Sequence, residues 1–354
     1  GHFAQAGGEQ LNLAADREIA LEALLARVSR TALGLLHRFA ASRLSILIFH
    51  RVHAEVDTIF PGEPDATRFA MLMRFVARSF RVMTLGEAAS RLTNGDLPMR
   101  ALVVTFDDGY ADNAEVALPI LQRYGVPASF FISTGFLDGG RMWNDSVIET
   151  IRACAMDELD LESFGMGRCS LAGPAERRSV IGELLSRIKY STLTERDEAI
   201  VRLQRLAGVR DLPNGLMMRS EQVRQLQRAG MEIGAHTVHH PILTSLAPAE
   251  AEREISTGRQ RLEGIIDAPV DVFAYPNGKP VRDYDRTHVA MLSRLGFRAA
   301  VSTAPGVARA GDGLLELPRF TPWGDSLAIW ALRLMNNQRN VRYQLAASPN
   351  GSLA

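Results

Sequence analysis

The stretch ALVVTFDDGY, residues 101–110, indicates the fold class of this chain of 354 residues. It opens with a largely apolar run rich in strand-forming side chains, which is typical of a strand buried on both faces. The run ends at two adjacent carboxylates, Asp107 and Asp108, and a glycine that favours a turn. In parallel β/α folds, active sites lie at the carboxyl ends of the strands. A lone Asp-Asp-Gly is more often a simple polar turn, so the surrounding sequence has to decide its role.

Short apolar runs of the same kind recur along the chain, and patterns typical of amphipathic helices separate them. This alternation predicts β/α units and a parallel sheet. Seven or eight such units favour a closed barrel over an open sheet. The strand-like runs are Ser45–Phe49, a weaker Arg81–Thr84, Ala101–Phe106, Ala128–Ile132, Glu232–Ala235, Val270–Tyr275, Arg298–Ser302 and Leu314–Leu317.

The same patterns predict how the chain is organised. Residues 41–335 form the barrel, and residues 141–218 interrupt its rhythm with helical patterns and no convincing strand. We interpret that interval as a helical insertion; an independent domain is the alternative. Residues 1–40 form a tail and a helix, with helical periodicity over 12–40, and residues 336–354 form a C-terminal tail. A helix packed on the barrel is favoured over a membrane-surface helix, because its charges are of both signs.

Composition excludes several classes of protein. Forty Lys and Arg residues balance forty Asp and Glu residues, which argues against a general nucleic-acid binder. No stretch reaches the roughly 18 uncharged apolar residues that predict a transmembrane span. The two cysteines, Cys154 and Cys169, cannot form a disulfide framework or by themselves a four-cysteine zinc site, although one bridge between them stays open.

Two further motifs follow strand-like runs. In HTVHH, residues 236–240, His236 and His240 have the i, i+4 spacing that places both imidazoles on one face of a helical turn. That spacing suits two ligands of one divalent metal, and imidazole with carboxylate suits zinc and its neighbours. A surface histidine cluster explains the motif equally well. The stretch FAYPNG, residues 273–278, is by itself only a rigid turn at a strand end.

The three motifs together occur in an order that resembles the polysaccharide deacetylase family, carbohydrate esterase family 4, whose members share the NodB homology domain. The resemblance covers about residues 44–319. It implies an α/β fold, a distorted (β/α)7-type barrel, here with a helical insertion and an N-terminal helix. It also implies a metal-dependent hydrolase that removes N-acetyl groups from polymers or oligosaccharides containing N-acetylglucosamine.

The resemblance also implies residue roles. Asp107 would be the catalytic base, and Asp108, His236 and His240 would bind one divalent metal ion, with Zn²⁺ favoured over Co²⁺, Ni²⁺, Mn²⁺ or Fe²⁺. Three protein ligands leave room for water and the acetyl oxygen, and the metal would activate both. The backbone N–H of Tyr110 would help to stabilise the oxyanion.

The expected general acid is placed differently from the common family pattern. Many members use a histidine near the C-terminus, but no histidine follows His288 here. Residues 48–52, IFHRV, instead resemble the Tyr-His-x-Val strand that opens the barrel in the exopolysaccharide-type subgroup. This resemblance predicts His50 as the general acid, and a structural histidine that caps the first strand is the alternative.

A second departure concerns the arginine that orients the catalytic aspartate, because Ala274 occupies its usual position. Arg319 could supply that charge and hold the carboxylate through two hydrogen bonds, or could be an ordinary surface residue. Trp143 is a candidate for stacking on a sugar, or an anchor of the insertion. Tyr275 and Pro276 of the third motif complete the expected substrate-binding residues.

Two other functions remain open at this stage. One is a small-molecule amidohydrolase or deformylase on the same fold, since no separate carbohydrate-binding module is evident. The other is an inactive carbohydrate-binding protein, which the presence of the complete motif set disfavours. A formal net charge of zero fits a neutral acetylated sugar. No signal peptide is visible, and the compartment, cytoplasmic or cell-envelope, and the oligomeric state stay open.

Overall fold

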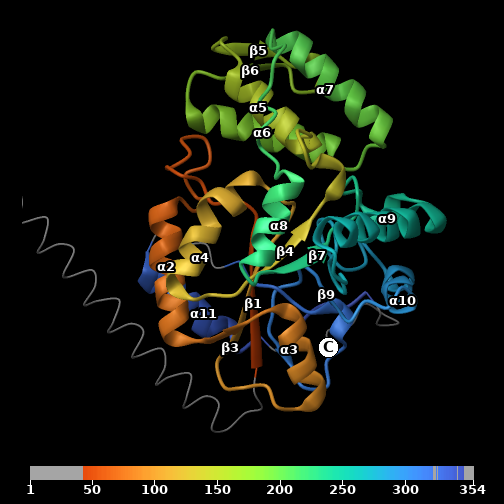
Figure 1. Cartoon of the computed structure of the whole chain (residues 1–354). Coiled ribbons are helices and arrows are strands. Elements are labelled where there is room, and N and C mark those ends of the chain that lie inside the picture. Colours follow the sequence, from red (N-terminus) through yellow and green to blue (C-terminus); the bar gives the residue numbers. More distant parts are fainter. Residues whose placement is uncertain (1–42, 322–323, 325, 341, 347–354) are drawn as a thin grey trace, which may run out of the picture.

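A curled, mostly parallel β-sheet forms the centre of the molecule, with helices around it (Figure 1). The computed structural model describes residues 43–321, 324, 326–340 and 342–346, so the helix expected at residues 12–40 lies outside the described part. The sheet order is β10-β1-β3-β4-β7-β8-β9, and β2 also pairs with β3. The strands are β1 (Arg43–Phe49), β2 (Arg81–Met83), β3 (Ala101–Phe106), β4 (Ser129–Ile132), β7 (Glu232–Ala235), β8 (Val272–Ala274), β9 (Ala299–Val301) and β10 (Ala308–Arg309).

The strand that ends at the two aspartates is the central one. β3 pairs in parallel with β1 from Leu44 opposite Ala101 to Phe49 opposite Phe106. Its other edge is shared, because β2 pairs with its first half and β4 with its second half. All residues of β3 are buried, as expected for a strand covered on both faces. The predicted α/β architecture is therefore confirmed.

Helices carry the chain from one parallel strand to the next, and capping side chains mark where several of them begin. Asp65 accepts hydrogen bonds from the first N–H groups of α2, and Thr84 does so for α3. Those around the sheet are α2 (Ala66–Ser79), α3 (Leu85–Asn94), α4 (Leu118–Tyr124), α8 (Ser220–Arg228), α9 (Pro248–Ile266), α10 (Arg286–Arg294) and α11 (Leu327–Asn337).

A short extended segment, residues 317–320, joins the two ends of the curled sheet. Leu317 bonds to β9 through Ala300 and Ser302, and Phe320 bonds to β1 through Ile46 and Ile48. The sequence predicts a strand at Leu314–Leu317, and this prediction is wrong: Leu314–Glu316 is a 3₁₀ turn. Pro318 has no N–H to donate, so the segment makes isolated bridges instead of a regular ladder.

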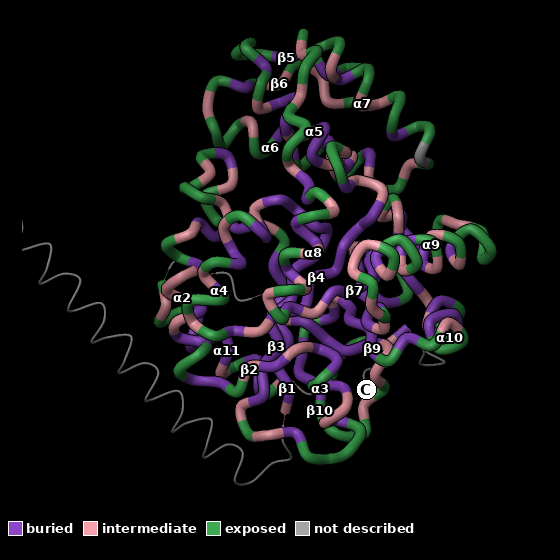
Figure 2. The backbone as a smooth tube through the Cα atoms, viewed as in Figure 1, coloured by how far each residue is buried: buried purple, intermediate pink, exposed green. Residues whose placement is uncertain are grey.

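The insertion after β4 has its own apolar core (Figures 1 and 2). It contains α5 (Trp143–Ala153), β5 (Glu158–Asp160), β6 (Arg168–Ser170), α6 (Pro174–Ile188) and α7 (Leu193–Ala207). The sequence predicts only helices here, so the antiparallel β5–β6 pair is a correction. Its strands have three residues each, which is too short for an alternating pattern to show. Both cysteines are free thiols; Cys154 is buried in this core and Cys169 is partly exposed.

Aromatic rings fill the barrel beneath the site. Phe106 stacks between Phe49 and Phe130, with ring centroids 5.4 and 4.7 Å away. Complete burial of each ring contributes about 2–3 kcal/mol to folding, and offset stacking adds to it. These rings fix the ends of β1, β3 and β4, which carry the polar residues described next. In the described part of the chain, no helix combines the length and apolar character that a membrane crossing requires.

Candidate active site at the carboxyl ends of the strands

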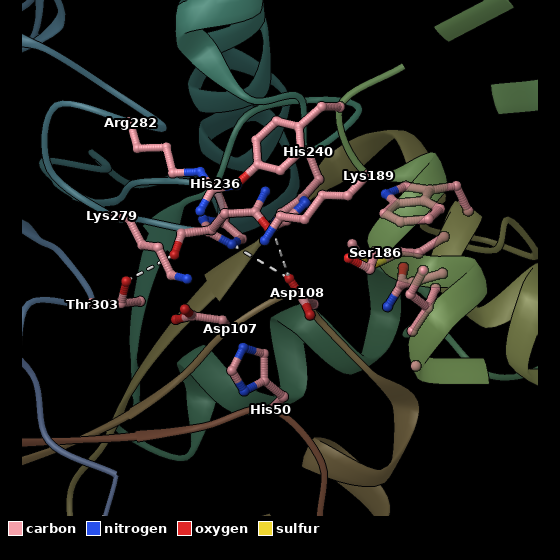
Figure 3. Close-up of a pocket in the computed structure, with 17 residues that line it drawn as sticks. His50, Asp107, Asp108, Ser186, Lys189, His236, His240, Lys279, Arg282 and Thr303 are labelled. Carbon is pink, nitrogen blue, oxygen red and sulfur yellow. Dashed lines mark hydrogen bonds and ion pairs between the residues drawn. The ribbon is translucent and has the colours of Figure 1, made fainter. Parts of the chain in front are cut away.

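A cavity of about 470 Å³ lies where the carboxyl ends of the parallel strands meet the insertion (Figure 3). The strands supply polar residues one after another around it. His50 follows β1, Asp107 and Asp108 follow β3, and His236 follows β7. The wall also includes residues from the turn after β8, Thr303 after β9, and residues in and next to α5 and α6 of the insertion. Residues spread over most of the sequence therefore share one space.

Asp108, His236 and His240 form a compact group in this cavity. Asp108 Oδ1 lies 3.4 Å from Nε2 of each histidine, and one ligand atom from each residue lies within 4.8 Å of the others. Asp108 and His236 are buried, and His240 is nearly so. Asp108 Oδ1 has no hydrogen-bond partner among the described residues. A buried carboxylate oxygen without a donor is costly, and a cation would satisfy it.

The donor chemistry of these three residues fits a divalent metal such as zinc. His236 Nδ1 lies 2.7 Å from the carbonyl oxygen of Ala274, which sets its tautomer and leaves Nε2 facing Asp108. Burial lowers the pKa of His240 to about 4, so its imidazole is neutral at pH 7, as metal binding requires. Burial opposes ionisation of Asp108, but His240 and His236 outweigh it and hold its pKa well below the usual range.

The backbone around these residues is strained. Asp108 has a φ of 75° and His240 a φ of 52°, both in the left-handed region that non-glycine residues rarely adopt. Glu254 of α9 holds the histidine loop by accepting the N–H groups of Val238 and His239 at 3.0 and 2.9 Å. Strain of this kind persists only where the surrounding contacts enforce it, and it is frequent at functional sites.

Arg319 holds Asp107 through two parallel hydrogen bonds. Its Nη1 donates to Oδ1 at 2.7 Å and its Nη2 to Oδ2 at 2.6 Å. The guanidinium also donates to the Thr105 hydroxyl and the Ser302 carbonyl, so it is fixed from three directions. Burial opposes ionisation of Asp107, but the Arg319 charge outweighs it and keeps its pKa below the usual value. The carboxylate is therefore ionised and oriented.

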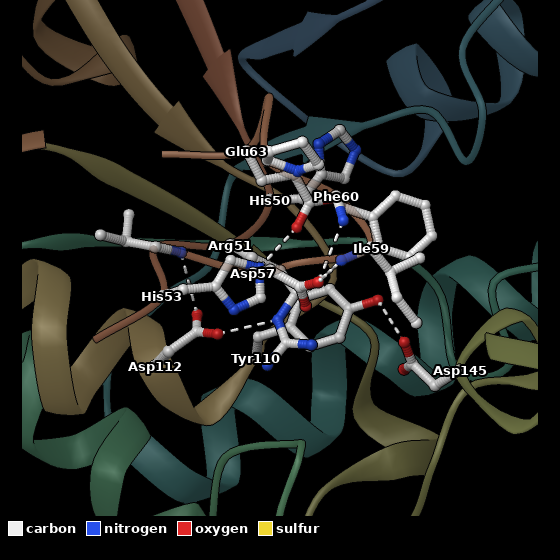
Figure 4. A network of polar contacts seen from close by, with 12 residues as sticks. His50, Arg51, His53, Asp57, Ile59, Phe60, Glu63, Tyr110, Asp112 and Asp145 are labelled. Atoms are coloured by element: carbon white, nitrogen blue, oxygen red, sulfur yellow. Dashed lines mark hydrogen bonds and ion pairs between the residues drawn. The ribbon is translucent and has the colours of Figure 1, made fainter. Parts of the chain in front are cut away.

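His50 enters the cavity from the other side, close to both aspartates (Figure 3). Its backbone belongs to a polar network around residues 50–53 (Figure 4). Asn113 donates to the His50 carbonyl at 2.8 Å, and Asp112 accepts from Arg51 at 2.8 Å and from the Val52 N–H at 3.3 Å. These bonds fix the segment that carries the imidazole.

Known proteins with similar sequences identify the family of this chain. The family model for polysaccharide deacetylase matches residues 94–178 and 188–300, which is more than half of the chain. This chain belongs to the polysaccharide deacetylase family. The resemblance inferred from the motifs is thus confirmed for the family, whose members deacetylate polysaccharides. The Bacillus subtilis (strain 168) protein YxkH, whose name refers to the same family, is 20% identical over 280 residues, covering 78% of this chain and 71% of that protein.

Two solved structures share the fold. The deacetylase PplD of Streptococcus pyogenes, in complex with acetate, matches with a TM-score of 0.55 and 19% identity, covering 84% of this chain and 99% of that one. IcaB from Ammonifex degensii matches with a TM-score of 0.53 and 20% identity, covering 82% and 97%. At these identities the likeness concerns the fold.

In this polysaccharide deacetylase, the residues expected to bind substrate differ in their position relative to the cavity. Trp143 lines the cavity at the start of α5. Tyr110 is buried, and its hydroxyl donates to Asp145 at 3.1 Å (Figure 4). Its N–H has no hydrogen-bond acceptor among the described residues. Tyr275 and Pro276 are buried and are not among the residues that line the cavity, so their contact with substrate stays a prediction. Tyr275 stacks on Tyr284 with ring centroids 3.7 Å apart, so it supports the turn.

Sequence reasoning missed one side of the cavity. Lys189 and Tyr190 reach it from the end of α6, and Asn277, Lys279 and Arg282 reach it from the loop after β8. No local pattern marks these residues. Only Asn277 lies within a motif noticed in the sequence, and Lys189 follows a helix whose position over the barrel could not be predicted.

Proposed function

We propose that this protein is a metal-dependent N-deacetylase that acts on a carbohydrate containing an N-acetylated amino sugar. One observation carries the proposal: an ionised, arginine-held Asp107 adjoins the Asp108–His236–His240 group in one cavity. Such a pairing of a base with a cation site is what amide hydrolysis by activated water needs. Membership of the polysaccharide deacetylase family supports the reaction class.

The residue roles follow from the geometry. A divalent cation held by Asp108, His236 and His240 would supply Lewis acidity, polarising the acetyl carbonyl and acidifying water. Asp107 accepts a proton from the attacking water, and Arg319 keeps that carboxylate ionised and aimed. The free N–H of Tyr110 is available to the developing oxyanion. His50 donates the proton that the sugar nitrogen needs to leave as an amine. The early histidine resembles the one in the strand that opens the barrel in the exopolysaccharide-type subgroup.

The wall of the cavity keeps a second substrate class as an alternative. The α6 end of the insertion adds Lys189 and Tyr190 to one side of that wall. A bounded site of this kind also suits a short oligosaccharide or a small N-acylated molecule. Acetate release from N-acetylglucosamine oligomers of increasing length would separate the two, since a polymer enzyme gains activity with length.

The central experiment measures metal content and acetate release together. Protein stripped with a chelator should lose turnover on chitooligosaccharides or poly-N-acetylglucosamine and regain it with about one equivalent of Zn²⁺ or a related ion. Asp107→Asn should abolish turnover yet keep the ion, whereas His236→Ala should lose the ion. His239→Ala is the matched control, because that side chain is half exposed and pairs with Glu254 instead. Full activity after stripping, or in Asp107→Asn, would show the mechanism to be wrong.

His50 needs a separate test. His50→Ala should lower kcat strongly on an amide substrate and much less on an activated acetate ester, whose leaving group needs no proton. Equal loss on both substrates would assign His50 to structure instead of proton donation.

A further inference from the structure

Lysine is almost absent from this chain, and its few positions are informative. The 40 basic residues of the Lys and Arg class include only two lysines, Lys189 and Lys279. Both line the active-site cavity, although one ends an insertion helix and the other lies in the loop after β8 (Figure 3). Arg282 joins them from the same loop. Three cations from two separate parts of the chain therefore face one space.

None of these three cations forms a salt bridge within the described part of the chain. Arg282 and Lys189 instead lie near the ring of Tyr190, 4.5 and 5.8 Å from its centroid. The two aspartates of the cavity are committed, Asp107 to Arg319 and Asp108 to the histidines. Burial, with repulsion from Lys279 and Arg282, lowers the pKa of Lys189, and the buried carboxylate of Asp283 offsets part of this effect.

The loop that presents Lys279 and Arg282 is held in a strained shape. Val281 has a φ of 69°, which is unusual for a β-branched residue. Asp283 braces the loop: its Oδ2 accepts the Lys279 N–H at 3.0 Å, and its own N–H donates to the Lys279 carbonyl at 2.8 Å. A fold that enforces strain while gathering like charges indicates that the charges have a use.

We propose that the cavity binds a carbohydrate carrying an anionic group, a carboxylate or a phosphate, beside its N-acetylated sugar, and that Lys189, Lys279 and Arg282 recognise this group. The inference rests on the proposed function for the position of the acetylated sugar. Lysine ammonium groups are compact and can turn three donors toward an anion, which suits a crowded cavity better than planar guanidinium forks. Trp143 also lines the cavity, and its partly exposed ring offers apolar surface for the sugar.

Binding to an inactive protein tests the inference apart from catalysis. Zn²⁺-loaded Asp107→Asn protein would be titrated calorimetrically with two matched pairs: chitotetraose against a hyaluronan tetrasaccharide, and N-acetylglucosamine against its 6-phosphate. The anionic member of at least one pair should bind about tenfold tighter or more. The pair that responds identifies carboxylate or phosphate. Inorganic phosphate alone should bind more weakly than the sugar phosphate, and equal binding would overturn the carbohydrate part of the inference.

Charge variants in the same Asp107→Asn background identify the residues. Lys189→Gln and Lys279→Gln should each reduce the preference for the anionic ligand severalfold, and together they should abolish it. Arg187→Gln is the matched control, because it removes a positive charge two residues from Lys189 on an exposed side chain paired with Glu183. An unchanged preference in the double lysine variant, with melting temperatures equal to the control, would overturn the proposal.

The scarcity of lysine also permits a direct observation. Reductive methylation with ¹³C-formaldehyde keeps the lysine charge and labels only Lys189, Lys279 and the terminal amine. An anionic ligand should shift both lysine resonances, and its neutral partner should shift them far less. Acetate release from chitotetraose without anion preference would leave the proposed function standing and remove this inference. Lysine-dependent anion binding without any acetate release would support this inference and contradict the proposed function.

Discussion

Arg319→Met should destabilise the fold and stop catalysis at the same time. Arg319 is only 2% exposed, and its guanidinium makes two hydrogen bonds to Asp107, one to Thr105 and one to Ser302. Methionine fills much of the same volume but leaves the Asp107 carboxylate buried without a counter-charge. Removing one partner of a buried ion pair costs about 3–5 kcal/mol. With a urea m-value of about 3 kcal/mol/M, the unfolding midpoint should fall by more than about 1 M.

A double-mutant cycle attributes this cost to the ion pair. Asp107→Asn alone leaves a buried guanidinium with a poorer acceptor, and the double variant removes both charges. If the two side chains act as one unit, the double variant should be less destabilised than the sum of the single variants by about 2 kcal/mol or more. Arg319→Lys should fall between, because a lysine keeps the charge but cannot donate two parallel hydrogen bonds.

Urea unfolding followed by circular dichroism measures the unfolding free energies of the wild type and the four variants, and acetate release measures their turnover. Arg319→Met should lower kcat by at least about 100-fold, since the Asp107 carboxylate is then neither oriented nor kept ionised. Additive losses in the cycle, or near-normal turnover in Arg319→Met, would refute the idea that Arg319 positions Asp107.

Three further outcomes follow from contacts around the site. Burial raises the pKa of Asp145 to about 7, above the value of about 4 of an unfolded aspartate. The free energy of unfolding of the wild type should therefore fall, relative to Asp145→Asn, by as much as about 4 kcal/mol as the pH rises from about 4 to about 7. Parallel curves of unfolding free energy against pH for the two proteins, from urea unfolding, would contradict this. Glu254→Gln weakens the hydrogen-bond acceptor that holds the histidine loop. A chelator competition assay should therefore show metal affinity reduced about tenfold with unchanged stoichiometry. Equal affinity would show that Glu254 does not position the metal-binding histidines. Gly258→Ala would place a Cβ 2.8 Å from backbone atoms of Thr237 and should cost about 1–3 kcal/mol, whereas Gly264→Ala on the same helix meets nothing within 4 Å; equal melting temperatures for the two would refute the packing argument.

Much of the barrel was predictable because its signals are local. The strands that end at Asp107 and near His236 are short apolar runs, and each is followed directly by its polar residues. A strand buried on both faces is mostly apolar, and polar residues become frequent where it ends at solvent or at a site. The candidate catalytic and metal-binding residues therefore directly follow the apolar runs that predict strands. The order of these motifs was enough to indicate the family.

The failures occur where local signals are weak or misleading. The β5 and β6 strands are too short for a period of two to be recognised. The apolar run before Pro318 resembled a strand, yet it forms a 3₁₀ turn ahead of the segment that joins β9 to β1. The motif that contains Tyr275 also gave no sign that this ring stacks on Tyr284 in the core.

The sequence by itself determined the alternating elements and the residues able to bind a metal or accept a proton. The sequence left open whether Arg319 holds Asp107 or lies on the surface, and only the tertiary structure decided that the two meet across 212 positions of chain. It also decided that Lys189 and Lys279 face the same cavity. A net charge of zero over the whole chain conceals that local gathering of cations. These pairings depend on how the sheet curls and where the insertion packs, and such long-range contacts leave no pattern in any short stretch of sequence.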